Sequence, residues 1–269
     1  MAHTPVSIVE YCNSDAPFLT EFRRLLHRLR QPRDREELKS ILITSALLAE
    51  GKSTVCAVLG VVAAQKGIRT ILVDCDLRRP NLHTLLNVPK QMGMSDILAA
   101  GQTAKTVTKK TSLDKLDLVT AGLTRFPVGD ILDIGSIGDF LSSLKLYYDL
   151  VLVDSPPVIP VSDPMLLASA VDGVLMVVKA GATPREVVLR ALDILRSNGD
   201  KLLGTVLNNL TGSLPAYYDS SHYSYEYSID RADGGKTARQ SGGGSRKKRS
   251  AEKTTTSIDR PDADKSPRR

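Results

Sequence analysis

The order of apolar and polar positions along residues 16–208 predicts helices alternating with strands. Six short segments are apolar at nearly every position, which is typical of strands buried on both faces; they cover residues 41–45, 70–74, 116–120, 150–154, 173–178 and 202–208. Longer segments with apolar residues at helical spacing cover residues 16–30, 53–66, 131–146, 162–170 and 184–198. This alternation predicts an α/β fold, a three-layer sandwich whose mainly parallel sheet carries helices on both faces.

The pattern changes beyond the last predicted strand. Residues 213–228 hold five of the eight tyrosines of the chain: Tyr217, Tyr218, Tyr223, Tyr225 and Tyr227. Residues 229–269 contain almost nothing apolar, so they are predicted to form a disordered basic tail. The predicted organisation is therefore an N-terminal helix and linker (1–40), a folded domain (41–212), the tyrosine cluster (213–228) and the tail (229–269).

Composition adds limits on location and partners. The formal net charge of +6 arises in residues 230–269, which carry 12 Lys/Arg against 6 Asp/Glu, while residues 1–229 carry 24 of each. A neutral folded part does not favour nucleic-acid binding, and no nucleic acid is expected as a partner. The basic run 246–249 predicts either a solvated tail or attraction to anionic lipids or an acidic partner. With no long apolar segment and no secretory pattern in residues 1–10, we expect a cytoplasmic protein, with peripheral membrane contact through the tail.

One strand-to-helix junction has the pattern of a phosphate-binding loop. The predicted strand 41–45 is followed by a short loop, by Gly-Lys-Ser-Thr and by an apolar helix. Backbone N–H groups at the start of a helix bind anions, Lys52 can reach the outer phosphates, and the Ser53 hydroxyl can ligate Mg²⁺. The predicted nucleotide-binding residues here are Ala49, Glu50, Gly51, Lys52, Ser53 and Thr54. Leu48 and Ala49 replace the Gly or Pro of many such loops, which predicts a less permissive backbone.

Three carboxylates follow two of the buried strands. Asp74 and Asp76 end the strand 70–74, and Asp154 ends the strand 150–154. Ligands of parallel sheets bind at the carboxyl ends of strands, so these side chains are expected beside the phosphate loop. Two carboxylates suffice around Mg²⁺, which leaves the third as a general base. With a hydroxyl acceptor the reaction is that of a kinase, and with water it is that of an ATPase.

Together, residues 45–54, 71–80 and 151–157 resemble the motifs of the bacterial tyrosine kinases, the autokinases of capsule and exopolysaccharide synthesis. The resemblance extends over roughly residues 15–228 and includes the tyrosine cluster. It implies that Lys52 and the loop hold the phosphates of ATP, that Ser53, Asp76 and Asp154 arrange Mg²⁺, and that Asp74 is the base. It further implies an adenine contact by Asn208. The acceptors would be the five clustered tyrosines, supplied by a neighbouring subunit.

The resemblance also implies partners. The family forms rings through a helix with the pattern Glu-x-x-Arg-x-x-Arg, of which Glu21 and Arg24 are present while His27 stands in the third place. It also needs a membrane-spanning activator of the polysaccharide co-polymerase type, which would be a separate protein here. The family's Asn-Pro-x-Glu stretch is missing at residues 126–130.

Two other functions fit parts of the sequence. Partition and septum-placing ATPases share the fold and act as nucleotide-dependent dimer switches, but they carry a second lysine where this chain has Leu47, and they lack a tyrosine cluster. A nucleotide-binding adaptor without kinase activity is the other alternative, and Leu48 and Ala49 favour it. The tyrosine cluster itself could be a loose segment without chemistry.

Overall fold

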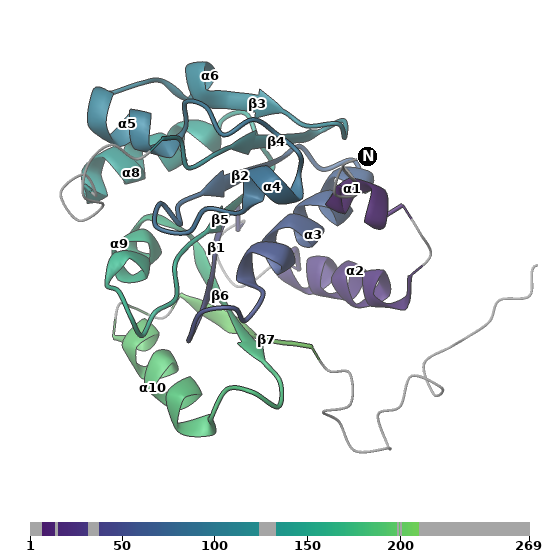
Figure 1. Ribbon diagram of the computed structural model, residues 1–269, viewed down its shortest axis with the longest axis vertical. Coiled ribbons are helices and arrows are strands. Elements are labelled where there is room, and N and C mark those ends of the chain that lie inside the picture. The colour runs from purple at the N-terminus through teal and green to yellow at the C-terminus, as the bar shows by residue number, and fades with distance from the viewer. Residues whose placement is uncertain are drawn as a thin grey trace, which may run out of the picture. The chain divides into compact units, whose positions relative to one another are not determined.

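The computed structural model describes residues 7–13, 16–31, 38–123, 133–197, 199 and 201–209, and these contain one seven-stranded sheet (Figure 1). Its strands are β1 (Ser40–Ser45), β2 (Thr70–Asp74), β3 (Thr108–Lys110), β4 (Leu116–Val119), β5 (Leu150–Asp154), β6 (Gly173–Lys179) and β7 (Leu202–Asn208). They are ordered β3-β4-β2-β5-β1-β6-β7, and only β3 runs antiparallel to its neighbour. The predicted mainly parallel α/β sheet is confirmed.

Helices cover both faces of this sheet, as predicted. They are α1 (Ile8–Tyr11), α2 (Pro17–Leu29), α3 (Lys52–Gln65), α4 (Leu82–Leu85), α5 (Met94–Ala100), α6 (Ala104–Val107), α8 (Ile134–Leu144), α9 (Asp163–Ala170) and α10 (Arg185–Arg196). Alternate residues of β1 enter two separate cores: Ile41 and Ile43 pack with α2 and α3, and Leu42 packs with α8, α9 and α10. The helix α3 is buried nearly all round because it lies between the sheet and α2.

The helix α2 lies against the folded domain. Its residues Leu19, Leu26 and Leu29 are buried in the same core as α3, while its arginines remain on the outside. The apolar stripe therefore predicted the helix and its buried face correctly. The domain boundaries predicted at residues 212 and 228 lie outside the described residues and stay predictions.

The elements that the sequence did not predict are short. They are β3 and the helices α1, α4, α5 and α6, each of three to seven residues. The strand β3 has the sequence Thr-Lys-Lys and lies at the edge of the sheet, where only one neighbour and little burial shape its composition. Elements of this length bury too few side chains to give a readable period.

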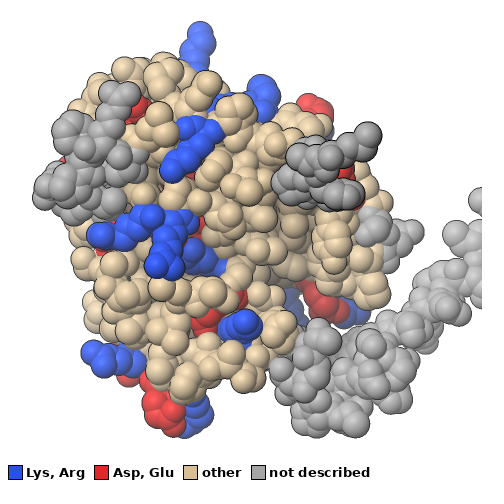
Figure 2. All heavy atoms as spheres, in the orientation of Figure 1, with Lys and Arg blue, Asp and Glu red and all other residues tan. Residues whose placement is uncertain are grey.

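The surface and the cysteines agree with the composition. On the face shown in Figure 2, Lys and Arg side chains form separate small groups, several of them beside Asp or Glu, rather than one continuous basic surface. The three cysteines Cys12, Cys56 and Cys75 are buried and unpaired, as small core residues. Among the described residues, no helix is both long and apolar enough to cross a membrane.

Candidate functional site

Three neighbouring strands end at one edge of the sheet and bring the predicted site residues together. The strand β5 lies between β2 and β1, and its register aligns Asp154 with Asp74 on one side and with Ile43 on the other. The phosphate loop follows β1, and Asp76 follows β2. Asp74 and Asp154 are 0% exposed and Asp76 is 1% exposed. Three carboxylates are therefore buried within one small region next to the loop.

Lys52 is the cation at this edge that pairs with them. Its Nζ lies 2.8 Å from Asp76 Oδ2, and it donates to the Ser53 hydroxyl at 3.5 Å. Burial lowers the pKa of Lys52, but the nearby charges of Asp154 and Asp76 outweigh it and place the pKa above its usual value. Lys52 is therefore an ammonium ion at neutral pH, available to an anionic ligand.

Asp74 and Asp154 are buried carboxylates with unused oxygens. Asp74 Oδ2 accepts backbone hydrogen bonds from Asn81 and Leu82 at 3.1 Å each, whereas Oδ1 has no hydrogen-bond partner among the described residues. Neither oxygen of Asp154 forms a hydrogen bond of ordinary geometry, although the nearby Ser53 hydroxyl acts to lower the pKa of this carboxyl group. Burial raises the pKa of Asp74 to about 6 and that of Asp154 to about 8. A cation or a hydrogen-bond donor placed beside these carboxylates would therefore stabilise their ionised form.

The donor set fits Mg²⁺ held together with a nucleotide. The unpartnered oxygens of Asp154, the Asp76 carboxylate and the Ser53 hydroxyl are hard oxygen ligands, which Mg²⁺ prefers. Within the described ranges, no group of three or more His, Cys, Asp or Glu side chains is arranged to hold a metal ion by itself. Mg²⁺ takes most of its ligands from phosphates and water and only one or two from carboxylates.

The Glu50 side chain holds the phosphate loop in place through hydrogen bonds to the protein. Glu50 is 2% exposed, and its carboxylate accepts from the backbone N–H of Leu47 at 2.6 Å and of Lys179 at 3.2 Å. It also accepts from the Thr183 hydroxyl. The Glu50 side chain thus turns into the protein and ties the loop to the end of β6. Of this residue, only the backbone remains available to a nucleotide.

Asn208 also contacts the loop. Its Nδ2 donates to the Glu50 carbonyl at 2.9 Å, and a Cβ on Gly51 would lie 2.1 Å from that nitrogen. Gly51 has φ +89°, so both the backbone conformation and the close approach of Asn208 require glycine there. The adenine contact expected of Asn208 stays a prediction. Thr54, also predicted to bind nucleotide, lies exposed in the first turn of α3.

Ala49 carries the strain of this loop. Its φ is +60°, in the left-handed region that glycine adopts without steric cost. We expect Ala49→Gly to raise the free energy of unfolding of the nucleotide-free chain by about 1 kcal/mol, measured by urea denaturation. The matched control is Ala99→Gly, at an exposed position within α5, which should lower it by about 0.5–1 kcal/mol. Equal losses from both substitutions would show that Ala49 is not strained.

Two further interactions of the site were not predicted. Arg78 donates to Asp163 from Nε at 2.9 Å and from Nη2 at 3.2 Å, which joins the loop after β2 to the start of α9. The backbone amides of Asn81 and Leu82 orient Asp74, as described above. Arg78 lies in the motif 71–80, but nothing in the sequence identifies Asp163 as its partner, because 85 residues separate the two.

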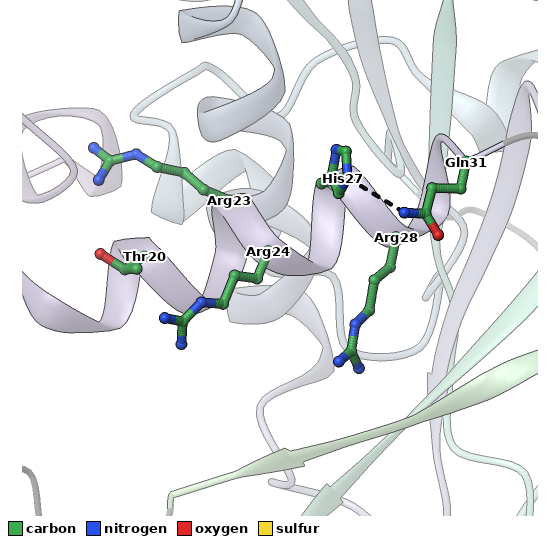
Figure 3. A pocket seen from close by; sticks show the side chains of 6 residues that line it. All are labelled: Thr20, Arg23, Arg24, His27, Arg28 and Gln31. Atoms are coloured by element: carbon green, nitrogen blue, oxygen red, sulfur yellow. Dashed lines mark hydrogen bonds between the residues drawn. The ribbon is translucent and has the colours of Figure 1, made fainter. Parts of the chain in front are cut away.

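The predicted oligomer contact lies on a different surface. The outer face of α2 forms a surface depression lined by Thr20, Arg23, Arg24, His27, Arg28 and Gln31 (Figure 3). Arg24 Nη1 lies 2.5 Å from Glu21 Oε1, and Gln31 Nε2 lies 3.3 Å from His27 Nε2. Figure 3 shows Arg24 and Arg28 extending to the same side of the helix. This face is basic, and most of its side chains are open to a partner.

The five clustered tyrosines and the basic run 246–249 lie outside the described residues, as does the stretch 126–130. Their predicted roles therefore rest on the sequence.

Comparison with known proteins identifies relatives in sequence and in fold. Residues 41–219 match the family model of the CobQ/CobB/MinD/ParA nucleotide binding domain. The tyrosine-protein kinase YwqD of Bacillus subtilis is 32% identical over 172 residues, which cover 64% of this chain and 73% of YwqD. The structure of the kinase domain of the Escherichia coli tyrosine kinase ETK superposes with a TM-score of 0.68 at 28% identity, covering 71% of this chain and 75% of that domain.

The rival ATPases are related through the fold. The septum site-determining protein MinD of Pyrococcus horikoshii, solved with Mg-ADP, has a TM-score of 0.59 at 22% identity and covers 68% of this chain and 76% of its own. At that identity the likeness shows the fold alone. Leu47, at the position of the second lysine of such ATPases, is partly buried against the core, and its amide binds Glu50.

Proposed function

This chain belongs to the bacterial tyrosine kinases within the CobQ/CobB/MinD/ParA nucleotide-binding family, and we propose that it transfers phosphate from Mg-ATP to its own C-terminal tyrosines. The observation that carries the proposal is the environment of Asp74. It is a buried carboxylate with one oxygen fixed by two amides and the other unused, beside the Lys52–Asp76 pair. A site that only hydrolysed ATP or bound it as a switch would not need the tyrosine cluster.

Each residue has a distinct part in the proposed reaction. The amides at the start of α3 and the Lys52 ammonium bind the phosphates. Ser53, Asp76 and Asp154 would hold Mg²⁺, which would offset the charge of the phosphates. Asp74 accepts at Oδ1 the proton of the tyrosine hydroxyl as the tyrosine oxygen bonds to the terminal phosphorus of ATP; the bond from that phosphorus to the bridging oxygen breaks, and ADP leaves. The burial of the three carboxylates keeps water away from the same region.

The proposed acceptors are Tyr217, Tyr218, Tyr223, Tyr225 and Tyr227 of a neighbouring subunit. Two chains test this when mixed with Mg-ATP. One has Lys52→Met and an intact cluster, and the other has an intact site and all five tyrosines changed to phenylalanine. Mass spectrometry should find phosphate on the cluster of the Lys52→Met chain. If the unaltered chain acquires no phosphate on the cluster, even with membranes from the cells that produce it, the proposed function is wrong.

The proposed partners follow from the basic face of α2 and from the family. A second copy would contact this face, with the exposed Glu21–Arg24 pair opening to meet it. A separate membrane-spanning protein would activate the kinase, and the tail could add contact with the inner face of the membrane. Control of polysaccharide polymerisation and export is the proposed role. An unchanged particle mass after Glu21→Ala would contradict the helix contact.

A further inference from the structure

Two adjacent arginines in the loop after β2 have different surroundings. Arg78 is held by both oxygens of Asp163, a carboxylate that is 4% exposed. The Arg79 side chain is exposed and forms no hydrogen bond or ion pair with the described residues, although its backbone N–H donates to Asp76 Oδ1 at 2.9 Å. One arginine therefore fixes the loop, and the other presents to solvent a guanidinium that has no partner in the described part of the chain.

The backbone of Arg79 lies next to the site, and its exposed side chain adds a cation to this part of the surface. The loop is anchored on one side of Arg79 by Asp76 and on the other by the amides of Asn81 and Leu82, which bind Asp74. The site below it holds three carboxylates against the one ammonium of Lys52. Once the nucleotide is bound, an acceptor that carries negative charge is repelled unless a cation lies near the entrance.

The tyrosine cluster is such an acceptor. Asp219 directly follows Tyr218, and Glu226 stands between Tyr225 and Tyr227. Residues 213–228 contain no Lys or Arg, so the segment is acidic although the tail that follows is basic. An acidic residue next to each of three tyrosines would place a carboxylate near this part of the surface whenever one of those tyrosines reaches Asp74.

We propose that Arg79 selects the acceptor by pairing with the carboxylate next to the tyrosine, so that the preferred substrate is an acid-flanked tyrosine. This inference rests on the proposed function, since it assumes that the cluster is the substrate. Arg79 is here a specificity determinant, and it contacts neither the base nor the nucleotide. The alternative is that Arg79 binds a phosphate of ATP, in which case its loss would change the affinity for ATP and would not depend on the charge of the acceptor.

A charge-reversal experiment separates these possibilities. The enzyme chain carries the five Tyr→Phe changes, with or without Arg79→Glu. The acceptor chain carries Lys52→Met, with either the natural cluster or Asp219→Arg and Glu226→Arg. Initial rates of phosphate incorporation are measured against the concentrations of acceptor and of ATP. Arg190→Glu, an exposed position on α10, makes the same change in net charge away from the site and is the control.

With the natural acceptor, Arg79→Glu should lower kcat/KM about tenfold, through a higher KM for the acceptor, because an attraction becomes a repulsion. The reversed acceptor should restore the rate of the Arg79→Glu enzyme to within about threefold and should be a poor substrate of the unaltered enzyme. The Arg190→Glu enzyme should not distinguish the two acceptors.

Other results would overturn the proposal. An equal loss with both acceptors, or a raised KM for ATP, would assign Arg79 to the nucleotide or to the fold. If Arg79→Glu has no effect while the natural cluster is labelled normally, the inference is wrong and the proposed function stands. If even the unaltered enzyme labels no cluster, the proposed function fails and the inference fails with it.

Discussion

A Lys52→Met chain is expected to label its tyrosine cluster at least about a thousandfold more slowly than the unaltered chain. Methionine nearly matches the length of lysine but carries no charge, so three buried carboxylates would face the triphosphate with no ammonium among them. Asp76 Oδ2 would also lose its partner at 2.8 Å. The affinity for ATP should fall for the same reason.

The measurement is incorporation of phosphate into the cluster at saturating Mg-ATP, together with nucleotide binding by calorimetry. Lys66→Met is the matched control, because Lys66 is exposed at the opposite end of the same helix. This control should label at the normal rate. Labelling that survives Lys52→Met would move the chemistry to another part of the chain.

The second large effect is expected at Asp74. Replacement by asparagine preserves an oxygen that accepts from the amides of Asn81 and Leu82 but removes the base, so kcat should fall by about 10²–10⁴. The KM for ATP should change little, because Lys52 and the loop remain. Asp139→Asn, at an exposed position on α8, is the control and should be fully active.

The pH dependence of the rate tests the same assignment. Burial raises the pKa of Asp74 to about 6, and only the ionised carboxylate can accept the proton of the tyrosine. In the unaltered chain kcat/KM should therefore show, below the fall near pH 8 at which Asp154 takes up a proton, a second fall as the pH decreases through about 6. The residual rate of the Asp74→Asn chain should lack this fall. A fall centred near pH 4, or one that persists in Asp74→Asn, would assign it to another group.

The sequence predicted the six strands that are mostly apolar, whether they are buried on both faces or, like β7, partly exposed at the edge of the sheet. Residues 70–74, 150–154 and 202–208 are strands with the predicted bounds, whereas the polar edge strand β3 was missed. The convergence of Lys52, Asp76 and Asp154 followed from one rule, that parallel strands carry their ligands at their carboxyl ends.

The partners of the site residues could not be predicted in the same way. Glu50 belongs to the nucleotide loop by its place in the motif, yet its side chain binds Thr183, which lies 133 residues further along the chain. The bond between Arg78 and Asp163 spans 85 residues. Such pairs depend on which loops come together at the edge of the sheet. The local periodicity of apolar residues does not contain this information. The left-handed conformation of Ala49 was foreseen only as a loss of backbone freedom.

Because β7 ends beside the phosphate loop, the tyrosines of the same chain and those of a neighbouring subunit can compete for one site. Asn208 lies four strands from β2, about 19 Å at the usual strand spacing, and the nine residues from there to Tyr217 can span up to about 30 Å. Reach alone therefore lets each chain offer its own tyrosines to its own site at an effective concentration of roughly millimolar. A neighbour's tail gains no advantage from proximity. The neighbour's tyrosines can be the preferred acceptors only if assembly orients them better than the chain's own. Dilution should therefore lower the rate of phosphate transfer between chains and leave the rate of transfer within a chain unchanged.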